Sequence, residues 1–509
     1  MKFENKLVKN LIASILTYGL SFGISFFLTP YITKTLGVEA NGFVTLANQL
    51  VGYVSLITVA LTSMASRFVS INIYKKDFKK ANEYFSSVFI AMVILAISLS
   101  LPIAYLIFNI DAFINVSPQF VVDTKILFAL AFVNFFVGLI LEVYTIATYV
   151  TNKLYLQSIR SIEGTIIRCI VIVLLYAIFP SKMYFVTLAS IVNLLYTSWW
   201  HIHYTKKLLP DMRVSRYYFK WSAIKELISA GSWNIVIQLN NILNTGLDLL
   251  LSNWFLGEEK MGMLSVAKTI PVAISTMLNS VSGVFFPEMT RNYAAGNMNA
   301  FMGTVRKSIK ILGMIFNIPV VFLIVFGRDF YRLWQPNLDS RTLTILSLLT
   351  IITILVSGST AAVFGIFTIT NKLRFHSLTS MLGGVLNVVI VVLALWLLPE
   401  KYGIYVVAGI STFIIIVRNY FVTFPYAAKC IEQKWYAFHV PSFMTILGAG
   451  ISSLCAMLIK LVLVPTNWLA LFGCGIVTAV ICMGVNSLVV LKKEDRKYLI
   501  NVIENKIRR

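Results

Sequence analysis

The sequence contains few charged residues and few of the groups that bind metals or form disulfides. Only 13% of its 509 residues are charged, and it has five cysteines and four histidines. The cysteines are scattered and odd in number, so neither a disulfide framework nor a metal site is expected. His201 and His203 are two residues apart and point to different sides of a helix, which disfavours a metal-binding pair. No Gly-x-x-x-x-Gly-Lys motif is present, so ATP hydrolysis by this chain is not expected.

Acidic residues are also scarce, whereas apolar residues dominate. The chain has 21 acidic and 43 basic residues, for a net charge of +22, and is 58% hydrophobic. Its mean hydropathy is +0.81. A soluble domain does not need this much apolar sequence to fill its core, so we expect a polytopic membrane protein.

Long apolar segments divide the chain into about fourteen spans, each long enough to cross a bilayer core of about 30 Å. All are expected to be helices, because hydrocarbon offers the backbone no hydrogen-bond partners and the alternation of a β-barrel is absent. The expected spans lie near 10–33, 42–70, 85–108, 122–149, 161–180, 184–204, 226–256, 262–287, 304–327, 341–368, 379–398, 403–424, 442–464 and 468–491.

Basic residues are distributed unequally between alternate connections, which predicts the orientation. One set of connections holds about 30 of the 43 basic residues and the other about 7, the bias typical of cytoplasmic loops. Both termini are therefore expected in the cytoplasm. The positive charge is then mainly a signal of topology, so no nucleic-acid partner is expected.

The sequence contains an internal repeat with an offset close to 220 residues. Leu36, Gly37, Glu39, Gly42 and Ala47 recur as Leu256, Gly257, Glu259, Gly262 and Ala267, and Thr151-Asn152-Lys153-Leu154 recurs as Thr370-Asn371-Lys372-Leu373. Each repeat holds six spans, so both halves have the same orientation and a substrate path between them is expected. We therefore predict a six-helix bundle over 1–220, a second over 221–424, and two further spans with a basic cytoplasmic tail over 425–509.

Several short motifs resemble a known family. Phe286-Pro287-Glu288-Met289-Thr290-Arg291, followed by Ala295-Gly296-Asn297, resembles a Phe-Pro-x-x-Ser-Arg…Gly-Asp signature of polysaccharide-exporter flippases. The two turns at Gly37 and Gly257 resemble their paired outer turns, although Met263 stands where the family commonly has tyrosine. With the count of six, six and two spans, the chain is similar to the Wzx-type flippases of the multidrug, oligosaccharidyl-lipid, polysaccharide (MOP) superfamily. The resemblance implies an all-α, MATE-like, V-shaped fold.

The resemblance also implies a function in the bacterial cytoplasmic membrane. It predicts a flippase, not an enzyme, that carries an undecaprenyl-diphosphate-linked oligosaccharide to the outer leaflet by alternating access, for capsule, O-antigen or exopolysaccharide synthesis. Its expected partners are this substrate, membrane lipid and polysaccharide polymerase or assembly proteins. No cofactor is expected, and the candidates for a coupling ion are H⁺ and Na⁺. The alternative is a MATE-like cation-coupled multidrug exporter, and an enzyme of polysaccharide assembly is disfavoured by the short connections.

Charged residues inside the predicted spans are the first candidates for the site, since each costs about 2.5–3.5 kcal/mol at a helix centre. Glu142 and Arg168 lie at similar depth and could form a structural ion pair. Asp248 and Lys268 could also pair, and Lys268 is the preferred cation for a diphosphate. The substrate-binding cations we select are Arg67, Arg168, Lys268 and Arg418, and the candidates for coupling or structural ion pairs are Glu142, Glu163 and Asp248.

The seventh predicted span adds a row of amides. Asn234, Gln238, Asn241 and Asp248 fall on one face of a continuous helix, and Asn240 and Asn244 form a neighbouring stripe. Amides donate and accept hydrogen bonds, so these side chains could hold sugar hydroxyls in a cavity. They could equally join helices to one another.

Overall fold

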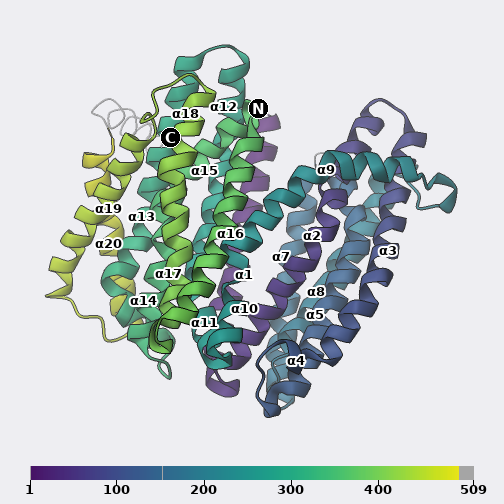
Figure 1. The fold of residues 1–509 in the computed structure, drawn as a ribbon. Coiled ribbons are helices and arrows are strands. Elements are labelled where there is room, and N and C mark those ends of the chain that lie inside the picture. The colour runs from purple at the N-terminus through teal and green to yellow at the C-terminus, as the bar shows by residue number, and fades with distance from the viewer. Residues whose placement is uncertain (1, 152, 492–509) are drawn as a thin grey trace. The chain divides into compact units, whose positions relative to one another are not determined.

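The computed structural model describes residues 2–151 and 153–491, and these form helices joined by short connections (Figure 1). No strand occurs in this part of the chain. Eleven helical segments are long and apolar enough to cross a membrane. Three more helical segments, formed by α1, α8 and the run from α9 to α10, match the remaining predicted spans. The basic tail predicted at the C-terminus, residues 492–509, lies outside the described residues.

The chain forms two compact units, 1–266 and 267–509. The boundary falls within α11, whereas the predicted boundaries near 220 and 424 describe the sequence repeat and stay a prediction. The first unit contains α1 (Lys2–Leu36), α2 (Val38–Tyr74), α3 (Phe78–Phe108), α4 (Ile110–Phe113), η1 (Pro118–Phe120), α5 (Val121–Leu141), η2 (Glu142–Thr145), α6 (Ile146–Val150), α7 (Leu154–Ile178), α8 (Phe185–Leu208), η3 (Arg216–Tyr218), α9 (Trp221–Asn241), η4 (Ile242–Gly246), α10 (Asp248–Leu256) and the start of α11 (Glu258–Ser282).

The second unit begins within α11 and holds the remaining helices. They are η5 (Gly283–Phe285), α12 (Phe286–Ala294), α13 (Met298–Trp334), α14 (Ser340–Ile351), α15 (Thr353–Ile369), α16 (Leu373–Leu397), α17 (Glu400–Arg418), η6 (Asn419–Thr423), α18 (Phe424–Cys430), α19 (His439–Lys460) and α20 (Trp468–Val489).

Some helix lengths repeat along the chain at the offset of the sequence repeat. The span Val38–Tyr74 has 37 residues, as has Glu258–Ala294, and α7 and α16 have 25 residues each. The caps repeat too. Asp77 accepts a hydrogen bond from the backbone N–H of Lys80 at the start of α3, and Asn297 accepts one from Ala300 at the start of α13.

The two glycine turns detected in the sequence meet in the first unit. Gly37 and Gly257 precede α2 and α11 with φ angles of 92° and 86°, a region that favours glycine. A Cβ atom added at Gly42 would lie 2.9 Å from the Gly262 Cα atom, so the two helices approach closely at their first turns. The Asn41 Nδ2 atom also donates to the Ser265 hydroxyl at 2.6 Å. The repeated glycines therefore permit a backbone contact between repeat-related segments.

Apolar side chains cover the outside of the helices as well as their packed faces. Phe27, Leu101 and Leu397 are 76%, 77% and 81% exposed on three different helices. Large apolar groups that face outward along whole helices are suited to lipid and would be unfavourable in water. The protein is therefore a multi-pass membrane protein, as its composition predicts.

Several of the predicted spans are interrupted, and two of these breaks lie next to predicted site residues. The 3₁₀ turn η2 separates α5 from α6, and the π-helix η4 separates α9 from α10. The prediction of one continuous helix through the seventh span is thus wrong. Because a π-helix has wider turns, the face that carries Asn234 and Gln238 does not continue in register to Asp248.

Candidate functional site

The first unit contains a polar cavity with a volume of about 540 Å³. It lies between α2, α5, η2, α8 and α9. This volume is within the range of small-molecule sites, about 300–1,000 Å³. Its polar lining residues are Ser55, Thr58, Thr62, Asn134, Glu142, Thr145, Thr197, Ser198, His201 and Gln238.

Glu142 is the acidic residue of this lining, and it stands at the break in its span. It is the first residue of η2, lines the polar cavity, and also lines a smaller adjoining cavity near Met92. Its side chain is exposed, and the charged groups in the described part of the chain give it no ion-pair partner. Short 3₁₀ stretches within a helix often mark functional hinges. A single carboxylate thus faces a cavity at a point where the span is interrupted.

Two further residues of the lining were not selected from the sequence. His201 is 8% exposed, and its Nε2 atom has no hydrogen-bond partner among the described residues; the same is true of the Asn134 Oδ1 atom. Buried polar atoms usually have partners, so these two can bond to a hydroxylated or ionic ligand. In the sequence, Asn134 and His201 are polar residues within apolar spans. This feature alone could have identified them as candidates.

The structure does not bring Glu142 and Arg168 together as an ion pair. Arg168 lies on α7, where its Nε atom is buried without a hydrogen-bond partner. Glu163 instead forms an ion pair with Arg160, whose Nη1 atom lies 2.6 Å from a Glu163 carboxylate oxygen. The Arg160 Nε atom donates to the Tyr204 hydroxyl at 2.9 Å, and its guanidinium lies 3.8 Å from the Trp200 ring centroid. Glu163 therefore has a structural partner three residues before it.

This network predicts that Glu163 supports folding. Glu163→Gln should lower the amount of folded protein in the membrane, because the change leaves the Arg160 guanidinium without its carboxylate. The double change Glu163→Gln with Arg160→Gln should restore part of the loss. Abundance measured by quantitative immunoblot of membranes tests this, and additive losses from the two changes would contradict the pairing.

The predicted amides occupy three different settings. The Asn234 Nδ2 atom donates to the Ser63 hydroxyl at 2.8 Å and so joins α9 to α2. Gln238 lines the polar cavity. The Asn244 Nδ2 atom donates to the Asn240 carbonyl oxygen at 2.8 Å, across the start of the π-helix, and Asn241 is the last residue of α9. The structure thus assigns Gln238 to a cavity lining and Asn234 to a contact between helices.

The remaining predicted charges lie on separate helices. Arg67 is exposed on α2. Arg418 ends α17, and its Nε and Nη1 atoms are buried without hydrogen-bond partners. Asp248 begins α10 and is 5% exposed, and Lys268 on α11 is 9% exposed. Asp248 belongs to the first unit and Lys268 to the second.

The described part of the chain thus combines membrane-crossing helices with a polar cavity inside one helical unit. In the described residues, no group of three or more His, Cys, Asp or Glu side chains could hold a metal ion. Residues 7–293 match the family model described as polysaccharide biosynthesis protein, and the chain belongs to this family.

A curated relative covers nearly the whole chain. It is the uncharacterized membrane protein EpsK of Bacillus subtilis (strain 168), 29% identical over 505 residues, which are 98% of each chain. Family and relative agree with the multi-pass membrane fold of this chain.

Solved structures share the fold at low sequence identity. The lipid II flippase MurJ in an inward closed conformation has a TM-score of 0.67 at 12% identity, over 95% of this chain and 100% of that one. An inward-facing multidrug resistance MATE family transporter of the MOP superfamily has a TM-score of 0.66 at 14% identity, over 82% of this chain and 94% of that one. The all-α MOP fold expected from the sequence is therefore confirmed.

Proposed function

We propose that this protein is a flippase for an undecaprenyl-diphosphate-linked oligosaccharide, which it moves from the cytoplasmic to the outer leaflet of a bacterial cytoplasmic membrane. The observation that carries the proposal is membership of the polysaccharide biosynthesis family in a chain with this membrane fold. Alternating access between its two repeats would move the head group, and the product would serve synthesis of a surface polysaccharide.

The chemistry of the polar cavity supports a carbohydrate ligand. Its hydroxyls and amides can donate to and accept from sugar hydroxyls, as Gln238 and Asn134 would do. A single carboxylate is a weak basis for a cavity that selects cationic drugs, whereas hydrogen-bonding groups predominate here. The alternative of a multidrug exporter is therefore less well supported.

The diphosphate of the substrate needs a cation within the membrane. Buried Lys268 is our preferred group, and Arg67, Arg168 and Arg418 are further candidates. An ammonium group can replace part of the hydration that the anion loses, and differential binding of this anion would shift the transporter between its states.

Glu142 is our candidate for coupling. A carboxylate that lines a cavity without an ion-pair partner can take up and release a proton or bind Na⁺, with Thr145 and His201 in the same lining. Binding of a proton or Na⁺ to the Glu142 carboxylate would then change the charge of the cavity during the transport cycle. Transport measured across imposed H⁺ or Na⁺ gradients distinguishes the two ions.

Both termini are proposed to lie in the cytoplasm, because the basic residues concentrate in one set of connections. A cysteine introduced at the exposed position Lys260 in a cysteine-free protein should react with an impermeant maleimide added to intact cells. One at Lys76 should react only after the cells are opened. The reverse pattern would overturn the orientation.

The function can be tested in cells through the position of the lipid intermediate. Cells without the protein should accumulate the polyprenyl-linked oligosaccharide on the cytoplasmic side and lose surface polysaccharide. Restoring the chain should reverse both effects. Normal polysaccharide together with lost resistance to cationic dyes would support the drug exporter instead. Reduced polysaccharide with no accumulated lipid intermediate would contradict the proposal.

A further inference from the structure

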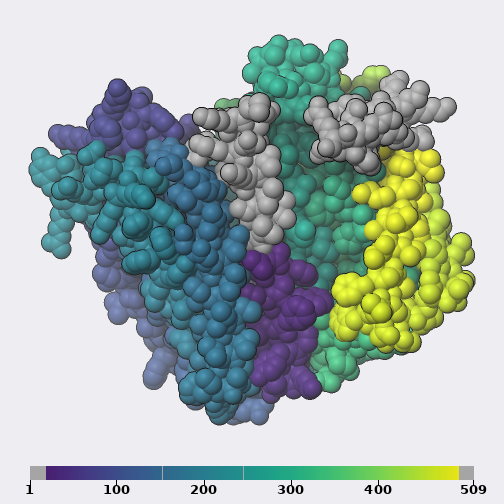
Figure 2. Space-filling model, turned by 180° about the vertical axis from the view of Figure 1, so that it is seen from behind, coloured from purple at the N-terminus to yellow at the C-terminus, as the bar shows by residue number. Residues whose placement is uncertain are grey.

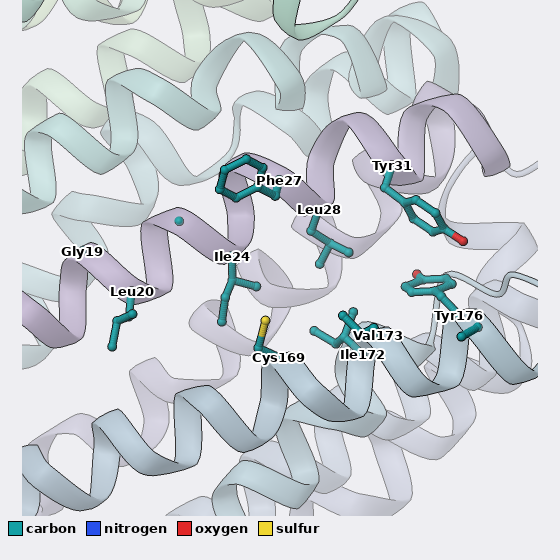
Figure 3. A pocket seen from close by; sticks show the side chains of 12 residues that line it. Gly19, Leu20, Ile24, Phe27, Leu28, Tyr31, Cys169, Ile172, Val173 and Tyr176 are labelled. Atoms are coloured by element: carbon teal, nitrogen blue, oxygen red, sulfur yellow. The ribbon is translucent and has the colours of Figure 1, made fainter.

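An apolar groove of about 630 Å³ runs between α1 and α7 in the first unit (Figure 3). Figure 2 places the described part of α1 at the surface, beside the blue segment that contains α7. The groove extends along α1 from Gly19 to Tyr31, about 18 Å at 1.5 Å per residue. This length is more than half of a bilayer core of about 30 Å. The groove is thus long enough for part of an extended hydrocarbon chain.

The floor of the groove is widened by glycine. No atom lies within 4 Å of a Cβ added at Gly19 or Gly23, one helical turn apart on α1. Ile24 and Cys169 face each other across the groove farther along (Figure 3). The open space beside the two glycines can receive the methyl branches of an isoprenoid chain.

One end of the groove is polar, in contrast to its apolar length. The ring centroids of Tyr31 and Tyr176 are 4.8 Å apart at this end (Figure 3), and the Tyr31 and Ser181 hydroxyls form a hydrogen bond of 3.2 Å. Lys182 follows Ser181 and forms an ion pair with Asp123 at 3.0 Å. This end therefore offers hydroxyl groups, and the ammonium of Lys182 is already neutralised.

Lys34 supplies a positive charge at the same end. It lies one helical turn beyond Tyr31 on α1, its side chain is exposed, and the charged groups of the described residues leave it without an ion pair. An apolar groove that ends in hydroxyls and an ammonium has the polarity of an anionic lipid. The proposed orientation places this end toward the outer leaflet.

We infer that the α1–α7 groove holds the part of the polyprenyl chain nearest the head group once that head group has reached the outer side of the membrane, with the diphosphate then at Lys34 and the Tyr31 and Ser181 hydroxyls. This inference rests on the proposed function and adds a binding site for the lipid portion. The chain must remain in hydrocarbon while its sugar crosses the membrane, so it needs an apolar path along the protein.

The energetics assign different roles to the two parts of the site. Bilayer lipid is as apolar as the groove, so the chain gains mainly shape-dependent packing there. The head group gains an electrostatic contact that a neutral lipid cannot make. Preference for the substrate over bulk lipid therefore depends on both the open space at the glycines and the charge of Lys34.

The test uses the full-length protein, purified in nanodiscs of phosphatidylcholine. The probe is undecaprenyl diphosphate that carries a diazirine in its polyprenyl chain. After illumination, mass spectrometry should find adducts concentrated in residues 19–31 and 169–177. Diazirine-labelled phosphatidylglycerol at the same mole fraction should label these residues no more than other lipid-facing helices. Lys34→Gln should lower the yield of undecaprenyl diphosphate adducts in these residues about fivefold, because one lysine near the membrane surface strengthens binding of an anionic lipid by about this factor. Lys401→Gln should leave this yield unchanged.

Glycine variants provide the matched control for the chain. Gly23→Leu should remove the preference for residues 19–31 and 169–177, because its side chain fills the groove. Gly473→Leu on α20, where a Cβ also meets open space, should leave the preference intact. Equal labelling of the groove residues by the two probes would mean that the groove contains bulk lipid only, and this result would overturn the inference. Undecaprenyl diphosphate adducts confined to other helices would overturn the inference but leave the proposed function standing. If undecaprenyl diphosphate labels no part of the protein more than phosphatidylglycerol does, both the inference and the proposed function are contradicted.

Discussion

Glu142→Gln should reduce surface-polysaccharide export to the level of cells that lack the protein, while folding and membrane insertion remain normal. Glutamine has nearly the same shape as glutamate but carries no charge and cannot exchange a proton. Because Glu142 forms no ion pair with the described residues, its loss leaves no partner charge stranded. Export is measured as cell-surface polysaccharide, and abundance as protein in purified membranes.

Two variants separate coupling from a general effect of charge. Glu142→Asp should keep part of the export, since the carboxylate survives with a shorter side chain. Glu400→Gln removes an exposed carboxylate at the start of α17, outside the polar cavity, and should leave export unchanged. Full export by Glu142→Gln at normal abundance would rule out a coupling role for this carboxylate.

Gly262→Ala should strongly destabilise the folded protein. A Cβ at this position would overlap the Val38 carbonyl oxygen and lie 2.6 Å from the carbonyl carbon. Overpacking typically costs about 1–3 kcal/mol, and here the obstacle is backbone that cannot rotate away. We expect a lower melting temperature in detergent and reduced abundance in the membrane.

Gly52→Ala is the matched control for this change. Gly52 lies within α2, one of the two helices that meet at Gly262, but a Cβ there would meet no atom within 4 Å. Its melting temperature should equal or slightly exceed that of the unchanged protein, since alanine favours helix more than glycine does. Equal melting temperatures for Gly262→Ala and the unchanged protein would mean that the close approach of α2 and α11 does not exist in solution.

The repeat was the most reliable prediction from the sequence, because it rests on identities at a fixed offset. The turns at Gly37 and Gly257 both have positive φ angles, and the helices that follow them begin at the residues that the offset predicts. The length and hydropathy of the apolar segments were sufficient to predict the membrane spans. Neither signal could reveal that Gly42 and Gly262 meet, since contacts distant along the chain leave no trace in periodicity.

Local breaks in helices were not predicted. Asn234, Gln238, Asn241 and Asp248 share a face only in an uninterrupted α-helix, and η4 breaks that helix between Asn241 and Asp248. The break at Glu142 was missed for the same reason. Hydrophobic periodicity assumes regular geometry, and a single 3₁₀ or π turn changes which side chains share a face.

Depth in the membrane proved insufficient to predict ion pairs. Glu142 and Arg168 match in depth, yet the pair that forms is Arg160 with Glu163, three residues apart on α7. Spacing of three or four residues on one helix is a local signal that could have suggested it. The polar groups of Asn134 and His201 required the packing of α5 against α8 to become part of one cavity.

Purified protein in liposomes gives the most direct test of the central claim. The substrate is a fluorescent undecaprenyl-diphosphate-linked oligosaccharide, and its accessibility to an impermeant quencher reports the leaflet that it occupies. Liposomes with the protein should transfer the labelled lipid between leaflets under an imposed H⁺ or Na⁺ gradient, and liposomes with the Glu142→Gln protein should not. Transfer no faster than in protein-free liposomes under every gradient would contradict the account.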